Sequence, residues 1–130
     1  MAWVVRAGAA KANDLRKGYK LHSGVPGLFG FSVQYAANKT IAGLAQAGQF
    51  PHSQISYEDE TVLAAALKPL GYSMRLAKSP GRGYRHTFAI LYDASGNMLS
   101  DLPQHAAAAL SLAFRRMPNP FPANPQGRIP

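Results

Sequence analysis

The chain has 130 residues, with 14 Lys and Arg against 6 Asp and Glu, and its formal net charge is +8. The absence of Cys excludes disulfide frameworks, thiol catalysis and thiolate zinc sites. The four His residues are not paired at helical metal-ligand spacing, so we expect no bound metal, and no motif implies another cofactor. This charge favours polyanion partners: RNA or other nucleic acid, an anionic membrane surface, or an acidic protein. A solvated basic surface without a dedicated target is the alternative.

The hydropathy of the chain bears on its location. No apolar run approaches the roughly 18–20 residues that a membrane-spanning helix needs, so we expect no membrane insertion. The first residues lack a basic segment followed by an apolar one, so no cleavable signal peptide is predicted. The expected location is the cytoplasm, with export without a cleavable signal still open. The oligomeric state cannot be predicted from these features.

Alternation of apolar and polar residues predicts strands at 2–7, 30–35 and 53–57, with a short edge strand at 98–102. Apolar spacing and terminal signals predict helices at 9–17, 39–47, 58–70 and 103–117. Asn38 and Ser56 are the expected N-terminal caps of the second and third helices. The acidic run at 58–60 is explained by the helix dipole, with a catalytic Glu as the alternative.

The stretch from Tyr72 to Tyr92 is the expected centre of the fold. Two strand patterns, 72–77 and 84–92, flank a turn at 78–83 that contains one Pro and two Gly. So short a connection requires an antiparallel hairpin. The hairpin also holds the densest positive charge of the chain. The residues predicted to contact nucleic acid are Arg75, Lys78, Arg82 and Arg85 of the hairpin and Gln34 of another strand. A solvent-exposed hairpin tip is the alternative interpretation.

The predicted strands each have one apolar and one polar face, which is typical of a sheet with one face left open. We therefore predict an α+β fold: a mainly antiparallel sheet of about five strands with helices packed on one face. Residues 1–117 are the expected single domain, and 118–130 a Pro-rich tail. The open face is predicted to carry a set of polar residues: Arg6, Ser32, Gln34, Gln54, Ser56, Arg75, Arg85 and Thr87.

Cleavage of RNA by its own 2′-hydroxyl needs a base, an acid and cations on the scissile phosphate. His86 is the first candidate for proton transfer, because imidazole titrates near neutral pH, and His22 is the second. The candidates for stabilising charge or donating hydrogen bonds are Arg6, Arg75, Arg85, Ser32, Gln34 and Thr87. His86 shares its strand face with Phe88 and Ile90, so a purely structural role in the core is the alternative.

With Arg6, Ser32, Gln34 and residues 85–87 in view, the chain resembles the small basic toxin domains of bacterial toxin–antitoxin, contact-dependent and type VI systems. The resemblance rests on size, charge and α+β layout. It implies a metal-independent ribonuclease with His, Arg, Lys and Ser or Thr on an exposed sheet. It also implies an acidic antitoxin or immunity protein as a partner.

The chain is also similar to ADP-ribosyltransferase toxins, which use nicotinamide adenine dinucleotide. Such toxins place an Arg or His at the end of the first strand, a Ser on a following strand and a catalytic Glu on a late strand. Arg6 and Ser32 match the first two positions, whereas Glu58 and Glu60 lie at a predicted helix start. A non-enzymatic basic module that binds nucleic acid or an acidic protein is the third hypothesis.

Overall fold

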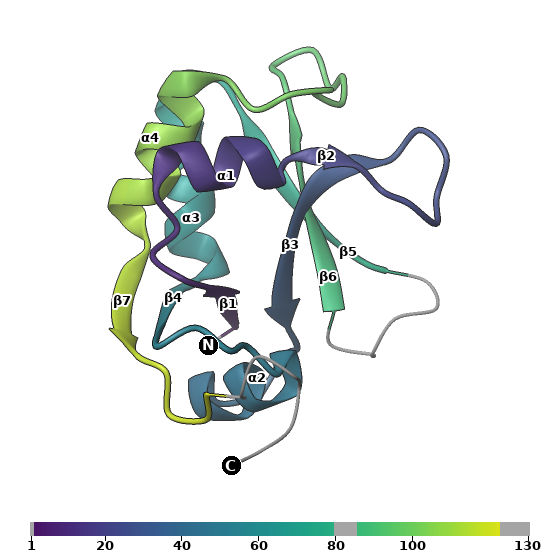
Figure 1. The fold of residues 1–130 in the computed structure, drawn as a ribbon. Helices are drawn as coiled ribbons and strands as arrows, with labels where there is room; N and C mark the ends of the chain where they lie inside the picture. The colour runs from purple at the N-terminus through teal and green to yellow at the C-terminus, as the bar shows by residue number, and fades with distance from the viewer. Residues whose placement is uncertain (1, 80–85, 123–130) are drawn as a thin grey trace.

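A computed structural model describes residues 2–79 and 86–122, in which strands and helices alternate along the chain (Figure 1). The elements in chain order are β1 (Trp3–Ala7), α1 (Ala12–Gly18), β2 (Lys20–Leu21), β3 (Phe29–Tyr35), α2 (Ile41–Gly48), β4 (Gln54–Asp59), α3 (Glu60–Leu67), a 3₁₀ turn (Lys68–Leu70), β5 (Ser73–Lys78), β6 (His86–Tyr92), α4 (Gln104–Ala113) and β7 (Arg115–Pro118). No helix of the described part is both long and apolar enough to cross a membrane.

The strands form one antiparallel sheet in the order β5-β6-β3-β1-β4-β7, and β2 pairs with β3 outside this path. The α+β class and the single domain are confirmed. The described residues form seven strands rather than about five, because β2 and β7 were not predicted. The predicted hairpin is confirmed by the pairing of β5 with β6, from Ser73 opposite Tyr92 to Lys78 opposite Thr87.

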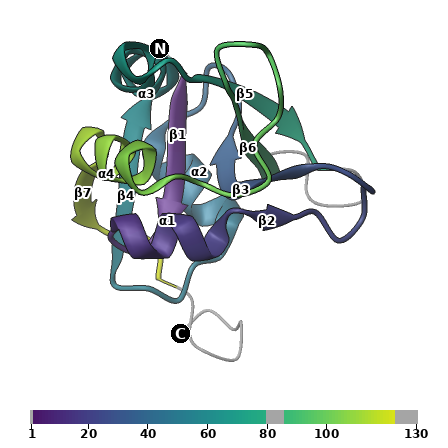
Figure 2. The ribbon, with the colours of Figure 1, turned by 90° about the horizontal axis from the view of Figure 1, so that it is seen from above.

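The main core lies on one face of the sheet, beneath α1, α3 and α4. Leu15, Leu63 and Leu110 from these helices pack with Val4, Phe31 and Val33 from the strands. A smaller cluster of Val5, Leu44, Ala45 and Ile55 lies on the opposite face, beneath α2. The two figures show α1 and α4 on one side of the strands and α2 on the other (Figures 1 and 2). The predicted open face is therefore covered in part by one helix.

Two predicted elements near the C-terminal end are wrong. The helix predicted to reach Met117 ends at Ala113, because Phe114 is extended and leads into β7. Residues 98–102 form no strand, and only an isolated bridge joins Met98 to Tyr92. The sheet includes Pro118, and Asn119 is buried, so the packed body continues past the predicted start of the tail.

The predicted caps are also wrong, for a common reason. Asn38 lies two residues before the true cap, and Thr40 caps α2 by accepting a hydrogen bond from the Gly43 amide. Asp59 caps α3 because β4 continues through it, and its carboxylate accepts from the Thr61 amide. In each case the strand or loop runs further than predicted, and the cap moves with it.

Cross-strand pairing divides the predicted polar face between the two sides of the sheet. Thr87 pairs with Val33 on the side of the main core, where it is 1% exposed. Ser56 and Arg6 also pair on that side. On the other side of the sheet, His86 pairs with Gln34 and the neighbouring Phe88 pairs with Ser32. Phe88 and Ile90 are buried, as predicted, but they lie outside the main core cluster.

Helix α4 offers a direct test of the core. Leu110 is fully buried in the main core, whereas Leu112 on the same helix is 86% exposed. We expect Leu110→Ala to lower the free energy of unfolding by roughly 2–5 kcal/mol, because it removes buried apolar surface and leaves a cavity. Leu112→Ala should change it by less than about 0.5 kcal/mol. Urea denaturation measures both, and equal effects would contradict this packing.

Candidate functional site

The sheet opens between its two central strands. β1 pairs with β4 along five residues but with β3 at only two, Val4 opposite Tyr35 and Val5 opposite Gln34. Beyond this point the side chain of Arg6 lies between the strands. Its Nη1 donates a hydrogen bond to the Ser32 carbonyl at 2.6 Å, and its guanidinium carbon lies 5.4 Å from the centre of the Phe31 ring. A charged side chain thus takes the place of the missing ladder hydrogen bonds.

The surroundings of Arg6 are unusual for a surface arginine. Burial lowers the pKa of its guanidinium, and the nearby Asp14 carboxylate acts in the opposite direction. The guanidinium lies against the last residue of α1, where a Cβ on Gly18 would come within 2.5 Å of Nη2. Glycine at this position therefore leaves the space that the Arg6 side chain occupies.

A cleft of about 1190 Å³ runs through this opening. Helix α1 and the residue before it contribute Lys11, Asp14, Lys17 and Gly18 to its lining, and β3 contributes Ser32 and Gln34. The end of α2 and the loop that follows it contribute further lining residues, among them Phe50 and His52. His86, at the start of β6, completes the lining. The cleft is larger than the roughly 300–1,000 Å³ of typical small-ligand sites.

Both lips of the cleft are held by residues near β7. The guanidinium of Arg116 donates to the carbonyls of Ala9 and Ala10, and the Ser56 hydroxyl donates to the Gly8 carbonyl. On the second lip, the loop after α2, the side-chain amide of Asn119 donates to the carbonyls of Phe50 and His52, at 3.1 and 2.9 Å. The loops that line the cleft are therefore fixed by specific hydrogen bonds.

The cleft brings together four of the residues proposed from the sequence: Arg6, Ser32, Gln34 and His86. The other described candidates lie elsewhere. His22 is buried against Phe88, with ring centres 4.5 Å apart, and its Nδ1 accepts from the Gly24 amide. Thr87 faces the main core, so its assignment to the polar face is wrong.

The predicted basic hairpin contributes little to the cleft among the described residues. Arg75 and Lys78 lie on β5, opposite Ile90 and Thr87 of β6. Neither residue lines the cleft. Arg82 and Arg85 lie outside the described residues.

Five residues that line the cleft were not predicted from the sequence: Lys11, Asp14, Lys17, Phe50 and His52. These residues lie in a short helix and a loop, where no periodic pattern marks a functional residue. Phe50 and His52 join the site because Ala7 pairs with Ile55, which brings the loop before β4 next to the end of β1, whereas Lys11, Asp14 and Lys17 come from α1 and the residue before it. Only the strand order, which the sequence did not predict, could have identified them.

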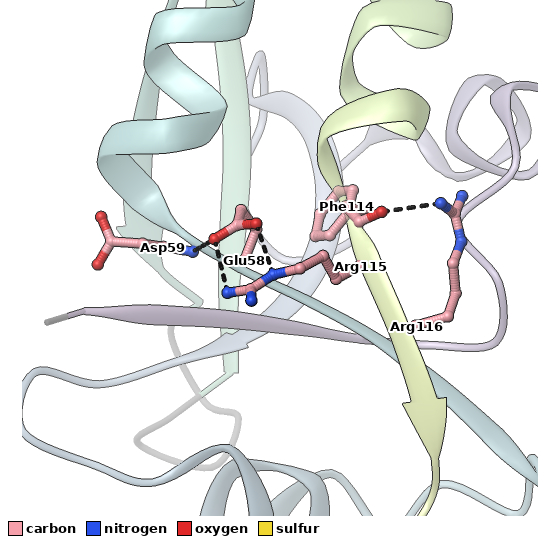
Figure 3. Close-up of polar contacts among 5 residues, drawn as sticks. All are labelled: Glu58, Asp59, Phe114, Arg115 and Arg116. Atoms are coloured by element: carbon pink, nitrogen blue, oxygen red, sulfur yellow. Dashed lines mark hydrogen bonds and ion pairs between the residues drawn. The ribbon is translucent and has the colours of Figure 1, made fainter.

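The acidic residues at 58–60 serve the scaffold. Glu58 pairs with Arg115, with Nε and Oε2 3.0 Å apart, and accepts a hydrogen bond from the Asp59 amide (Figure 3). The Arg115 guanidinium in turn lies 4.9 Å from the centre of the Tyr57 ring. Hydrogen bonds from Thr61 and the Ala2 amide lower the pKa of the Asp59 carboxyl. No group of three or more His, Asp or Glu placed to hold a metal ion occurs in the described residues.

Comparison with known proteins gives no further assignment, because no protein-family model, curated protein or solved structure matches the chain. The site is therefore interpreted from its own geometry.

Asn119 allows a test of how the lip is held. Asn119→Asp keeps the shape of the side chain but places a carboxylate against the carbonyls of Phe50 and His52. We expect a loss of roughly 1–3 kcal/mol in the free energy of unfolding and faster amide hydrogen exchange at 50–53. Asn13→Asp makes the same charge change at an exposed position of α1 and should have little effect. Unchanged exchange at 50–53 in Asn119→Asp would contradict the anchoring role.

Proposed function

We propose that the protein binds RNA in the cleft between β1 and β3 and cleaves it without a metal ion. One observation carries this proposal. Two imidazoles, His52 and His86, line the same cleft as three cationic side chains, Arg6, Lys11 and Lys17. These groups come from separate segments of the chain, and each has a role in the chemistry of phosphodiester cleavage.

The reaction follows from these groups. One imidazole takes the proton from the 2′-hydroxyl, whose oxygen attacks the adjacent phosphorus. The bond from phosphorus to the 5′-oxygen breaks, and the other imidazole donates a proton to that oxygen. The products are a 2′,3′-cyclic phosphate and a 5′-hydroxyl. Arg6 and Lys17 stabilise the negative charge that develops on the phosphate oxygens, and Gln34, which also lines the cleft, donates a hydrogen bond to them.

The same proposal includes where the protein acts and which partner it has. A ribonuclease of this kind would act in the cytoplasm, where RNA is abundant, and its expression without a partner would harm the host. An acidic antitoxin or immunity protein is the expected partner, because the chain carries a net charge of +8.

A second candidate function is ADP-ribosyl transfer, which the contact between Arg6 and the Ser32 carbonyl favours. In this case Arg6 would bind a phosphate of the dinucleotide. Glu58 and Glu60 do not line the cleft, and Asp14 is the acidic residue among its described lining. The cleft thus lacks the expected late-strand Glu, and we rank this function below RNA cleavage.

The main prediction concerns RNA cleavage in the presence of a chelator. The purified protein should cut total RNA and leave 2′,3′-cyclic phosphate ends. His86→Ala and His52→Ala should each lower the rate by about 10²–10⁴-fold, because each removes a general acid or base. Gel analysis of the products, with end-group mapping, measures both the rate and the chemistry.

His105 provides the matched control. It is exposed on α4, packs against Tyr72 and does not line the cleft, so His105→Ala should retain full cleavage. No cleavage by the wild-type protein would refute the ribonuclease. Consumption of the dinucleotide with labelling of a target, in a parallel incubation, would then select the transferase.

The lysines of the cleft should set the salt dependence of RNA binding. Lys11→Gln with Lys17→Gln should reduce the slope of log affinity against log salt by about 0.7 for each phosphate that is no longer neutralised. Lys39→Gln with Lys68→Gln removes the same charge outside the cleft lining and should leave the slope unchanged. Fluorescence anisotropy over a salt series measures this. Equal slopes for the two double variants would place the RNA elsewhere.

A further inference from the structure

An aromatic residue, Phe50, lines the same cleft as Arg6 and two lysines. Phe50 follows α2 and packs in part against the cluster of Val5, Leu44 and Ile55, yet it is only half-buried and is one of the residues that line the cleft. Arg6 lies at the opening between β1 and β3, with α1 alongside. One cleft is thus lined both by a cation suited to a phosphate and by an aromatic residue.

The Phe50 ring is held firmly in its place. A Cβ on Gly48 would lie 2.3 Å from Cζ of the ring and 2.5 Å from Cε1, so the ring tip rests directly on the backbone at the end of α2. The Phe50 carbonyl is fixed by the Asn119 side chain at 3.1 Å. An aromatic ring fixed in this way loses little conformational entropy when a planar group stacks on it.

We infer that Phe50 forms a base-stacking subsite, and that the cleft takes a single-stranded nucleotide with its phosphate at Arg6 and its base on the Phe50 ring. This inference rests on the proposed function and specifies its substrate. Stacking on aromatic side chains is the usual way in which proteins hold unpaired bases, and it tolerates different sequences. A base in a duplex is already stacked on both faces, so the site selects single strands. The volume of about 1190 Å³ leaves room for the phosphate and the base together.

Two glycines allow each half of the subsite to be disturbed without removing its functional group. Gly18 and Gly48 are the last residues of α1 and α2, where alanine is compatible with helical backbone. A methyl group at Gly18 would displace the Arg6 guanidinium, and one at Gly48 would displace the Phe50 ring. Gly18→Ala therefore probes the phosphate contact, and Gly48→Ala probes the base contact.

The experiment compares the affinity of the protein for two single-stranded DNA tetramers. One is a tetramer of thymidine, and the other has the same sugar-phosphate chain without bases. Neither can be cleaved, because the 2′-hydroxyl is absent. The wild-type protein should bind the thymidine tetramer roughly 5- to 150-fold more tightly, as one stacked base provides. Phe50→Leu and Gly48→Ala should reduce this ratio toward one, and Phe50→Trp should retain it. Gly18→Ala should weaken both tetramers and keep the ratio.

Fluorescence anisotropy at low salt measures the affinities, and circular dichroism verifies that each variant is folded. A ratio that stays unchanged in both Phe50→Leu and Gly48→Ala would overturn the stacking subsite. Equal binding of the two tetramers by the wild-type protein would also overturn it, while leaving phosphate binding in place. If the wild-type protein binds neither tetramer, the proposed nucleic-acid cleft itself fails.

Discussion

The placement of the Arg6 guanidinium inside the sheet is the constraint on which the site depends. Moving a cation from water toward a protein interior costs free energy unless other groups compensate. The compensation consists of the Ser32 carbonyl, the face of Phe31 and the field of Asp14, and the pKa of Arg6 is still lowered. Among the described residues, Arg115 forms a salt bridge with Glu58, whereas Arg6 forms no salt bridge. A bound phosphate would supply the missing anion, which is why an arginine in this place favours an anionic ligand.

The last strand determines the geometry of the cleft, although it contributes no side chain to the lining. β7 is joined to β4 by pairing from Tyr57 opposite Arg115 to Gln54 opposite Pro118, and the Glu58–Arg115 ion pair strengthens the same junction (Figure 3). From this position Arg116 reaches one lip and Asn119 reaches the other. The two lips are therefore held in register by nearby residues of one segment. Changes near β7 should act on the cleft at a distance, through the lips rather than through the chemistry.

The sequence predicted the fold class and much of the sheet, because alternating patterns at 30–35 and in the central hairpin report burial directly. It failed where local pattern and tertiary pairing disagree. The residues at 115–117 continue the predicted helical pattern, yet they form part of β7, which pairs with the free edge of β4. The site was predicted in part for the same reason. Arg6, Ser32, Gln34 and His86 lie on strands and could be recognised as polar positions, whereas Lys17, Phe50 and His52 join them only through the strand order.

The charges of the cleft also distinguish between the two reactions considered. Phosphodiester cleavage develops negative charge on the phosphate oxygens, which nearby cations stabilise. Transfer of a ribosyl group passes through a positively charged, oxocarbenium-like state, which a carboxylate stabilises and cations oppose. The described lining holds Arg6, Lys11 and Lys17 against Asp14 as its acidic residue. Asp14 lies on α1 between the two lysines in sequence, and its field acts on Arg6. The electrostatics of the cleft therefore fit the proposed RNA cleavage, whose transition state is anionic, better than ribosyl transfer, and in that proposal the two imidazoles would supply the proton transfers.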